Sequence, residues 1–136
     1  MPKTLKIWTL SLAVVAAILF AIALSNSAYE LTSPSTLQWH VLLRKTYSIG
    51  AFALVGYLLR RALPEFGRQN AFPTCIWAVA LFSAAIEVGQ DLTGSQEGYV
   101  SNLFDVFCGA VGGFVSVADL AVARLTSKRA RERPPR

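Results

Sequence analysis

The sequence predicts an all-α membrane protein, a polytopic bundle of four transmembrane helices with both the N- and C-termini in the cytoplasm. Hydrophobic residues make up 54% of the 136 residues and charged residues only 15%. This balance is too apolar for a small soluble domain. The apolar residues fall into four long stretches, and the lysines and arginines are distributed unevenly between the connecting segments. Together these features favour a chain that crosses a membrane four times.

Each of the four stretches has a length typical of a membrane-spanning helix. A helix needs roughly 20 apolar residues to cross the hydrocarbon core of a bilayer. Because lipid offers no hydrogen-bond partners to the backbone, we expect each span to be helical. The third stretch reaches the required length by continuing to about Gln90. The four stretches are Ile7–Leu24, Thr46–Leu63, Phe72–Ile86 and Leu103–Ala123.

The first stretch can also be interpreted as a signal peptide. Lys3 and Lys6 precede it, and a segment of small residues, Ser25–Ala28, follows it. The apolar region of a cleaved signal peptide is about 7–15 residues long, and this stretch is longer. We therefore favour a retained helix.

The positions of lysine and arginine favour a cytoplasmic N-terminus. In that orientation the outer loops hold only Arg44 and Lys45, and all other lysines and arginines lie in cytoplasmic segments. This asymmetry follows the positive-inside rule. The net charge of +5 is explained by this asymmetry, so it does not indicate nucleic-acid binding. We expect residues 1–126 to form the membrane domain and the basic residues 127–136 to be a disordered cytoplasmic tail.

Polar residues gather at one level of the predicted bundle, in the outer third of the bilayer. The second helix starts there, the third helix ends there and the fourth helix starts there. Charged residues inside a membrane are costly, and they usually face the bundle interior and have partners. The sequence therefore predicts a shared polar cluster. Its members are Lys45, Ser48, Glu87, Gln90, Ser101 and Asp105.

Helical spacing places Glu87 and Gln90 on one stripe with Ser83 and Asp91. We expect Lys45 or Arg44 to be the cationic partner of Glu87, with Gln90 and Ser101 as hydrogen-bond partners. Two interpretations stay open for this cluster. It is either a polar clamp that fixes the register of the helices or a functional site, and for Asp105 we favour a function.

Other residues of the predicted helices are assigned structural roles. Gly109 and Gly113 form a G-x-x-x-G motif, and with Gly112 they allow a neighbouring helix to approach closely. The motif fits contacts within the bundle or between chains. Phe107 and Phe114 fall on the opposite face. Trp39, Tyr47 and Tyr99 suit an outer aromatic belt and Trp8 an inner one, whereas Asp119 is interpreted as a structural residue beside the cytoplasm or Arg124.

The sequence predicts no metal site and no cofactor. Cys75 and Cys108 lie within predicted helices, without a C-x-x-C pattern or a nearby histidine. Both are interpreted as small buried apolar residues. His40, the single histidine, is interpreted as an interfacial loop residue.

Three segments resemble the VanZ-like family of small bacterial membrane proteins, over residues 44–115. They are "RKTYSIGAFALVGYLL", "ALFSAAIEVGQ" with its Glu-x-x-Gln, and "SNLFDVFCGAVGG" with an Asp followed by spaced glycines. The matching residues are Glu87, Gln90 and Asp105, and more weakly Lys45. The chain departs from the pattern where Ser48 stands in place of a histidine, where Gly109 stands in place of a frequent asparagine, and in the absence of an arginine before Asp105.

The resemblance implies a multi-pass protein of the bacterial inner membrane, in a family whose founding member is associated with resistance to the glycopeptide teicoplanin. We expect the outward-facing polar cluster to bind an amphiphilic or lipid-linked ligand of the cell envelope. Three alternatives stay open: an enzyme that uses Glu87 and Asp105 as acid and base on a lipid-linked substrate, a small proton-coupled exporter, and an accessory subunit. The lipid bilayer is the expected partner, nucleic acid is not, and the oligomeric state is open.

Overall fold

The computed structural model describes residues 3–25, 27–28, 31, 39–63, 71–93, 99–119 and 122, and most of these residues are helical. Within these ranges there are four long helices and no strand. The prediction of an all-α fold built from four helices is therefore confirmed. The helices are α1 (Lys3–Ala23), α3 (His40–Ala62), α4 (Ala71–Thr93) and α5 (Tyr99–Val115).

The observed helix ends differ from the apolar stretches in two places. Helix α3 begins at His40, before the predicted start at Thr46, because Arg44 and Lys45 are buried against the bundle and continue the helix. Helix α5 ends at Val115, before the predicted end at Ala123. A turn follows at Ser116, whose hydroxyl donates a hydrogen bond of 2.6 Å to the Gly113 carbonyl. A serine that bonds to the backbone in this way competes with regular helix bonding.

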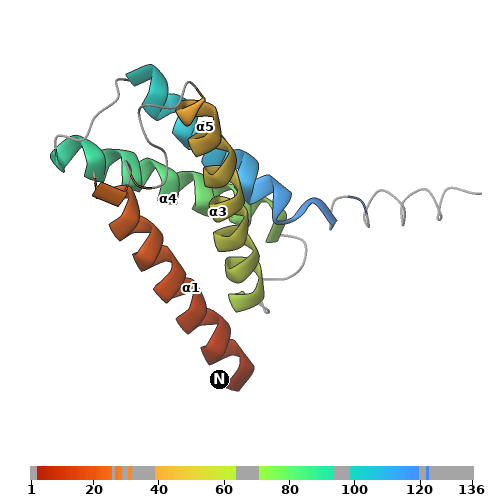
Figure 1. Ribbon diagram of the computed structural model, residues 1–136. Coiled ribbons are helices and arrows are strands. Elements are labelled where there is room, and N and C mark those ends of the chain that lie inside the picture. The colour runs from red at the N-terminus through yellow and green to blue at the C-terminus, as the bar shows by residue number, and fades with distance from the viewer. Residues whose placement is uncertain are drawn as a thin grey trace, which may run out of the picture.

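Successive helices run in alternating directions (Figure 1). Trp8, near the start of α1, meets Tyr57, near the end of α3, with ring centroids 6.3 Å apart. Phe72, at the start of α4, meets Phe114, at the end of α5, at 5.9 Å. The ends of α1 and α4 therefore lie with the starts of α3 and α5. We call this the polar end, because it carries Lys45, Glu87, Gln90, Ser101 and Asp105.

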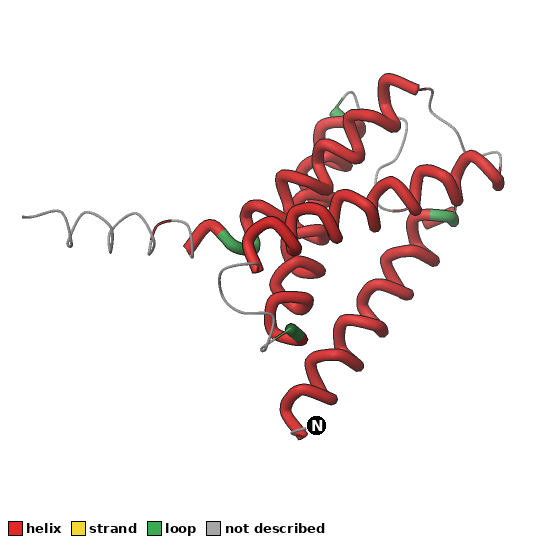
Figure 2. Tube along the Cα trace, turned by 180° about the vertical axis from the view of Figure 1, so that it is seen from behind, coloured by secondary structure: helices red, strands yellow, loops and turns green. Residues whose placement is uncertain are grey.

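Helix α1 lies at the edge of the bundle, whereas α3, α4 and α5 cross one another closely (Figures 1 and 2). The buried core consists of Phe52, Val55, Val79 and Ile86, and α1 packs Leu12, Val15, Leu19, Phe20 and Ala23 against it. The close crossings depend on the glycines of α5. A Cβ atom at Gly109 would lie 2.5 Å from the Ser83 Cβ of α4, and one at Gly112 would lie 2.5 Å from the Phe52 Cβ of α3. The glycine motif thus packs helices within this chain.

Large apolar side chains are exposed on all four helices. Two helices, over Lys6–Ala23 and Ala71–Thr93, are long and apolar enough to cross a membrane, and Ser101–Val115 is a shorter apolar helix. Phe107 and Phe114 point outward as predicted, and so do Trp39 and Tyr47 at the polar end. The side chain of Tyr99 and the tail 127–136 lie outside the described residues. The exposed set includes Ile7, Leu10, Leu54, Trp77, Leu81, Leu103 and Phe107.

Candidate functional site

A buried ion pair joins the starts of α3 and α5. Lys45 Nζ pairs with Asp105 Oδ2 and donates a second hydrogen bond of 3.3 Å to Ser101 Oγ. Ser101 and Asp105 are one helical turn apart on α5, so one lysine contacts both. Lys45 is only 7% exposed. Of the two cations predicted as partners of Glu87, Lys45 therefore belongs to Asp105 instead, because the glycines bring α3 close to α5.

Helix α4 fixes the backbone beside this pair. Ser83 Oγ donates a hydrogen bond of 2.9 Å to the carbonyl oxygen of Asp105, and Ser83 is fully buried. The carboxylate of Asp105 is thus oriented by α3 and its backbone by α4. Sequence reasoning placed Ser83 on the polar stripe of α4 but not among the site residues. Its spacing of four residues from Glu87, which puts both side chains on one face of α4, is the signal by which Ser83 could have been included.

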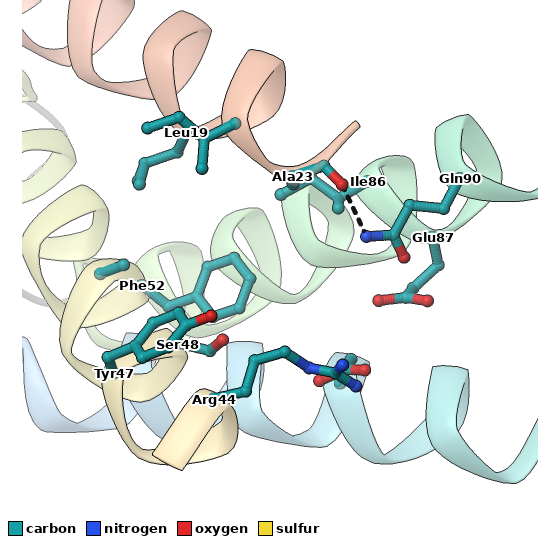
Figure 3. A pocket seen from close by; sticks show the side chains of 12 residues that line it. Leu19, Ala23, Arg44, Tyr47, Ser48, Phe52, Ile86, Glu87 and Gln90 are labelled. Atoms are coloured by element: carbon teal, nitrogen blue, oxygen red, sulfur yellow. Dashed lines mark hydrogen bonds between the residues drawn. The ribbon is translucent and has the colours of Figure 1, made fainter. Parts of the chain in front are cut away.

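A pocket of about 100 Å³ lies between the four helices beside the ion pair (Figure 3). In this view the carboxylate of Glu87 and the guanidinium of Arg44 extend from α4 and α3 toward the same part of the pocket. Glu87 is 9% exposed and Arg44 is 4% exposed. Charges in such a poorly solvated place interact more strongly than they do in water. The lining residues are Leu19, Ile22, Ala23, Arg44, Tyr47, Ser48, Ala51, Phe52, Ile86, Glu87, Gln90 and Asp105.

The helices contribute different kinds of side chain to this pocket. Helix α1 contributes only apolar side chains, and the hydroxyls of Tyr47 and Ser48 come from α3. The charged side chains come from Arg44, Glu87 and Asp105, and the last of these is paired with Lys45. Ile22 of α1 and Tyr47 of α3 line the pocket and are also partly exposed. This arrangement suits a small polar group attached to an apolar body.

Gln90 has a different role from the predicted one. Its Nε2 donates a hydrogen bond of 2.9 Å to the carbonyl oxygen of Ala23, the last residue of α1 (Figure 3). The final carbonyls of a helix have no partner within that helix. Gln90 therefore ties the end of α1 to α4 while lining the pocket. Asp91, predicted on the same stripe, is exposed and does not join the cluster.

The Gln90→Leu variant should unfold more easily, by about 0.5–1.5 kcal/mol, because the Ala23 carbonyl loses its hydrogen bond. The free energy of unfolding, measured in detergent micelles, tests this. The matched control is the neighbouring Asp91→Asn, which changes an exposed side chain and should have little effect. Equal losses in the two variants would contradict the assigned role.

The opposite end of the bundle carries an exposed ion pair. Arg60 Nη1 lies 2.6 Å from Asp119 Oδ1 and donates a 3.3 Å hydrogen bond to the Ser116 carbonyl. The Asp119 side chain is 66% exposed, which fits the structural role predicted for it. Its partner is Arg60, and Arg124, the predicted partner, lies outside the described residues.

The two thiols are separate and buried. Cys75 and Cys108 are both free. Among the residues that the structure describes, no group of three or more His, Cys, Asp and Glu side chains is placed to hold a metal ion. The side chain of His40 lies outside that description.

Comparison of the chain with protein-family models, with curated proteins and with solved structures gives no significant match. The resemblance to the VanZ-like family therefore stays a prediction that rests on the sequence motifs.

Proposed function

We propose that this chain is a multi-pass protein of the bacterial inner membrane, with four spans, cytoplasmic termini and an outward-facing polar end. The alternating helix directions and the uneven distribution of lysine and arginine support this orientation. In α3, Arg44 and Lys45 are separated from Arg60 and Arg61 by uncharged residues. Its 23 residues measure roughly 35 Å at about 1.5 Å per residue. The 14 uncharged residues between Lys45 and Arg60 cover about 21 Å of a hydrocarbon core of about 30 Å, which is consistent with a polar end inside the outer part of the bilayer.

We further propose that the polar end binds the head group of an amphiphilic ligand. The observation that carries this proposal is the presence of two carboxylates, Glu87 and Asp105, in a largely apolar pocket between the four helices. Burying charge inside a membrane protein costs free energy. Such groups are often retained for binding or chemistry, which favours a functional role.

The lining of the pocket specifies the chemistry of the ligand. The Asp105 carboxylate is already paired with Lys45, so Glu87 and Arg44 are the other charged groups at the pocket. A head group that carries both hydrogen-bond donors and acceptors complements them. A pocket of about 100 Å³ admits only a small part of such a head group. Exposed apolar side chains that line it, such as Ile22, suit a ligand that arrives through the bilayer. The VanZ-like resemblance suggests an envelope compound, either a lipid-linked precursor or a membrane-seeking antibiotic.

The proposal is tested by the susceptibility of a bacterial host to teicoplanin and other amphiphilic envelope-directed antibiotics. Wild-type protein should protect against at least one of them, and Glu87→Gln should abolish the protection. Direct binding of that compound should weaken by roughly tenfold or more, the size expected when a hydrogen bond to a charged group is lost.

The matched control is Asp119→Asn, which also removes one carboxylate but at the opposite, exposed end. It should protect as well as the wild type at equal membrane abundance. Protection that survives in Glu87→Gln, or a wild-type protein that protects against no compound in the panel, would contradict the proposal.

A further inference from the structure

A second concave site lies on the other side of the Lys45–Asp105 pair, between α3 and α5. It is a groove of about 940 Å³, within the roughly 300–1,000 Å³ typical of small-molecule sites. We infer that this groove binds an anionic phospholipid, with the phosphate at Lys45 and Ser101 and an acyl chain along the apolar wall. The lining residues are Trp39, Leu42, Lys45, Thr46, Ile49, Ser101, Phe104, Phe107, Cys108 and Val111.

The two members of the ion pair line different sites. Asp105 lines the pocket that also holds Glu87, whereas Lys45 lines the groove. The residues that line the groove include one cation and no carboxylate. The pocket therefore meets the carboxylate side of the pair and the groove meets its ammonium side, which favours an anion placed against Lys45.

Lys45 has bonding capacity left for a phosphate oxygen. An ammonium carries three N–H donors, and among the described residues Lys45 uses two of them, on Ser101 and Asp105. Its Nζ lies 5.6 Å from the centre of the Phe104 ring, which lines the groove. A bond from this ammonium to a phosphate is charge-assisted and therefore stronger than a neutral one.

The shape of the groove fits an acyl chain below that phosphate. From Ser101 to Val111 the groove follows α5 for roughly 15 Å, at about 1.5 Å per residue. Trp39, Phe104 and Phe107 are exposed aromatic side chains beside it. Aromatic rings are common where lipid head groups meet the hydrocarbon region. The polar groups lie at the polar end and the apolar wall leads away from it, as in a phospholipid.

This inference rests on the membrane placement proposed above but not on any ligand in the pocket. The test uses the full chain in nanodiscs of phosphatidylcholine. The chain has three tryptophans, so Trp8→Phe with Trp77→Phe leaves Trp39 as the fluorophore in the groove. A minor fraction of brominated phosphatidylglycerol or of brominated phosphatidylcholine is then added as a quencher. We expect phosphatidylglycerol to be enriched near Trp39 by up to about fivefold, the size expected for one uncompensated cation beside an anionic lipid.

Two variants in this background distinguish lipid binding in the groove from lipid contact with the rest of the surface. Val111→Phe narrows the groove and should abolish the enrichment. Val115→Phe makes the same change at an exposed position that lines neither site and should retain it. The neutral pair Lys45→Gln with Asp105→Asn should also abolish the enrichment without leaving a buried charge.

Equal quenching by the two lipids, or equal effects of the two valine variants, would overturn the inference. Loss of the enrichment on adding soluble glycerol phosphate would overturn the assignment to a lipid. A chain that does not enter nanodiscs would overturn the membrane placement itself. Failure of the antibiotic test alone would concern the pocket and its ligand, so the two proposals are separable.

Discussion

Replacing Lys45 with methionine should destabilise the folded protein by about 3–5 kcal/mol, because the Asp105 carboxylate then loses its ion-pair partner in a buried place. Lys45 is buried, and the Asp105 side chain is only 14% exposed. The attraction between two paired charges offsets the free-energy cost of removing both from water. When one charge is deleted, the remaining buried charge still has its own desolvation cost and no attraction to offset it. The free energy of unfolding in detergent micelles measures the effect.

The double variant Lys45→Met with Asp105→Asn should recover most of this loss, because no unpaired charge remains. The control is Arg60→Met, which breaks the other interhelical pair of α3. That pair is largely exposed on the Asp119 side, and exposed pairs contribute roughly 0–1 kcal/mol. Equal losses for Lys45→Met and Arg60→Met would show that burial of the Lys45–Asp105 pair has no special energetic effect.

The helix content and the common level of the polar residues could be predicted because both follow directly from hydropathy. Long apolar stretches identify helices in a chain of this composition, and alternating directions place every second helix end at the same level. Lys45, Glu87 and Asp105 lie at the polar end for that reason. The end of α5 was less predictable. The residues after Val115 are still apolar, and the turn depends on a local bond between the Ser116 hydroxyl and the Gly113 carbonyl.

The pairing of side chains within the cluster could not be predicted from spacing. Periodicity shows which residues share one face of a helix, but not which neighbouring helix that face meets. The pairing of Lys45 with Asp105 depends on the close α3–α5 crossing at Gly112. Gln90 bonds to the backbone of Ala23, an acceptor that every residue carries and that therefore gives no sequence signal. The groove depends on how side chains of both helices are arranged in space.

Replacing Gly112 with alanine should destabilise the protein by about 1–3 kcal/mol or more through overpacking. A Cβ atom there would lie 2.5 Å from the Phe52 Cβ and 2.9 Å from both the Ala53 nitrogen and the Ile49 carbonyl oxygen. Two of these atoms belong to the α3 backbone, so side-chain rotation cannot relieve the contact. The control is Gly50→Ala on α3, where nothing lies within 4 Å. That change should stabilise the helix by roughly 0.5–1 kcal/mol.

The Gly112→Ala variant should also open the α3–α5 interface, and Cys108 provides a readout of that opening. Cys108 is 1% exposed and lines the groove, and Cys75→Ala removes the other thiol of the chain. In that background a membrane-permeant maleimide should label Cys108 faster in Gly112→Ala than in the parent protein, and Gly50→Ala should leave the rate unchanged. Because the same crossing positions Lys45 beside Ser101 and Asp105, faster labelling should be accompanied by loss of the phosphatidylglycerol enrichment. A stable Gly112→Ala protein with a protected Cys108 would show that the crossing tolerates a wider spacing than this packing implies.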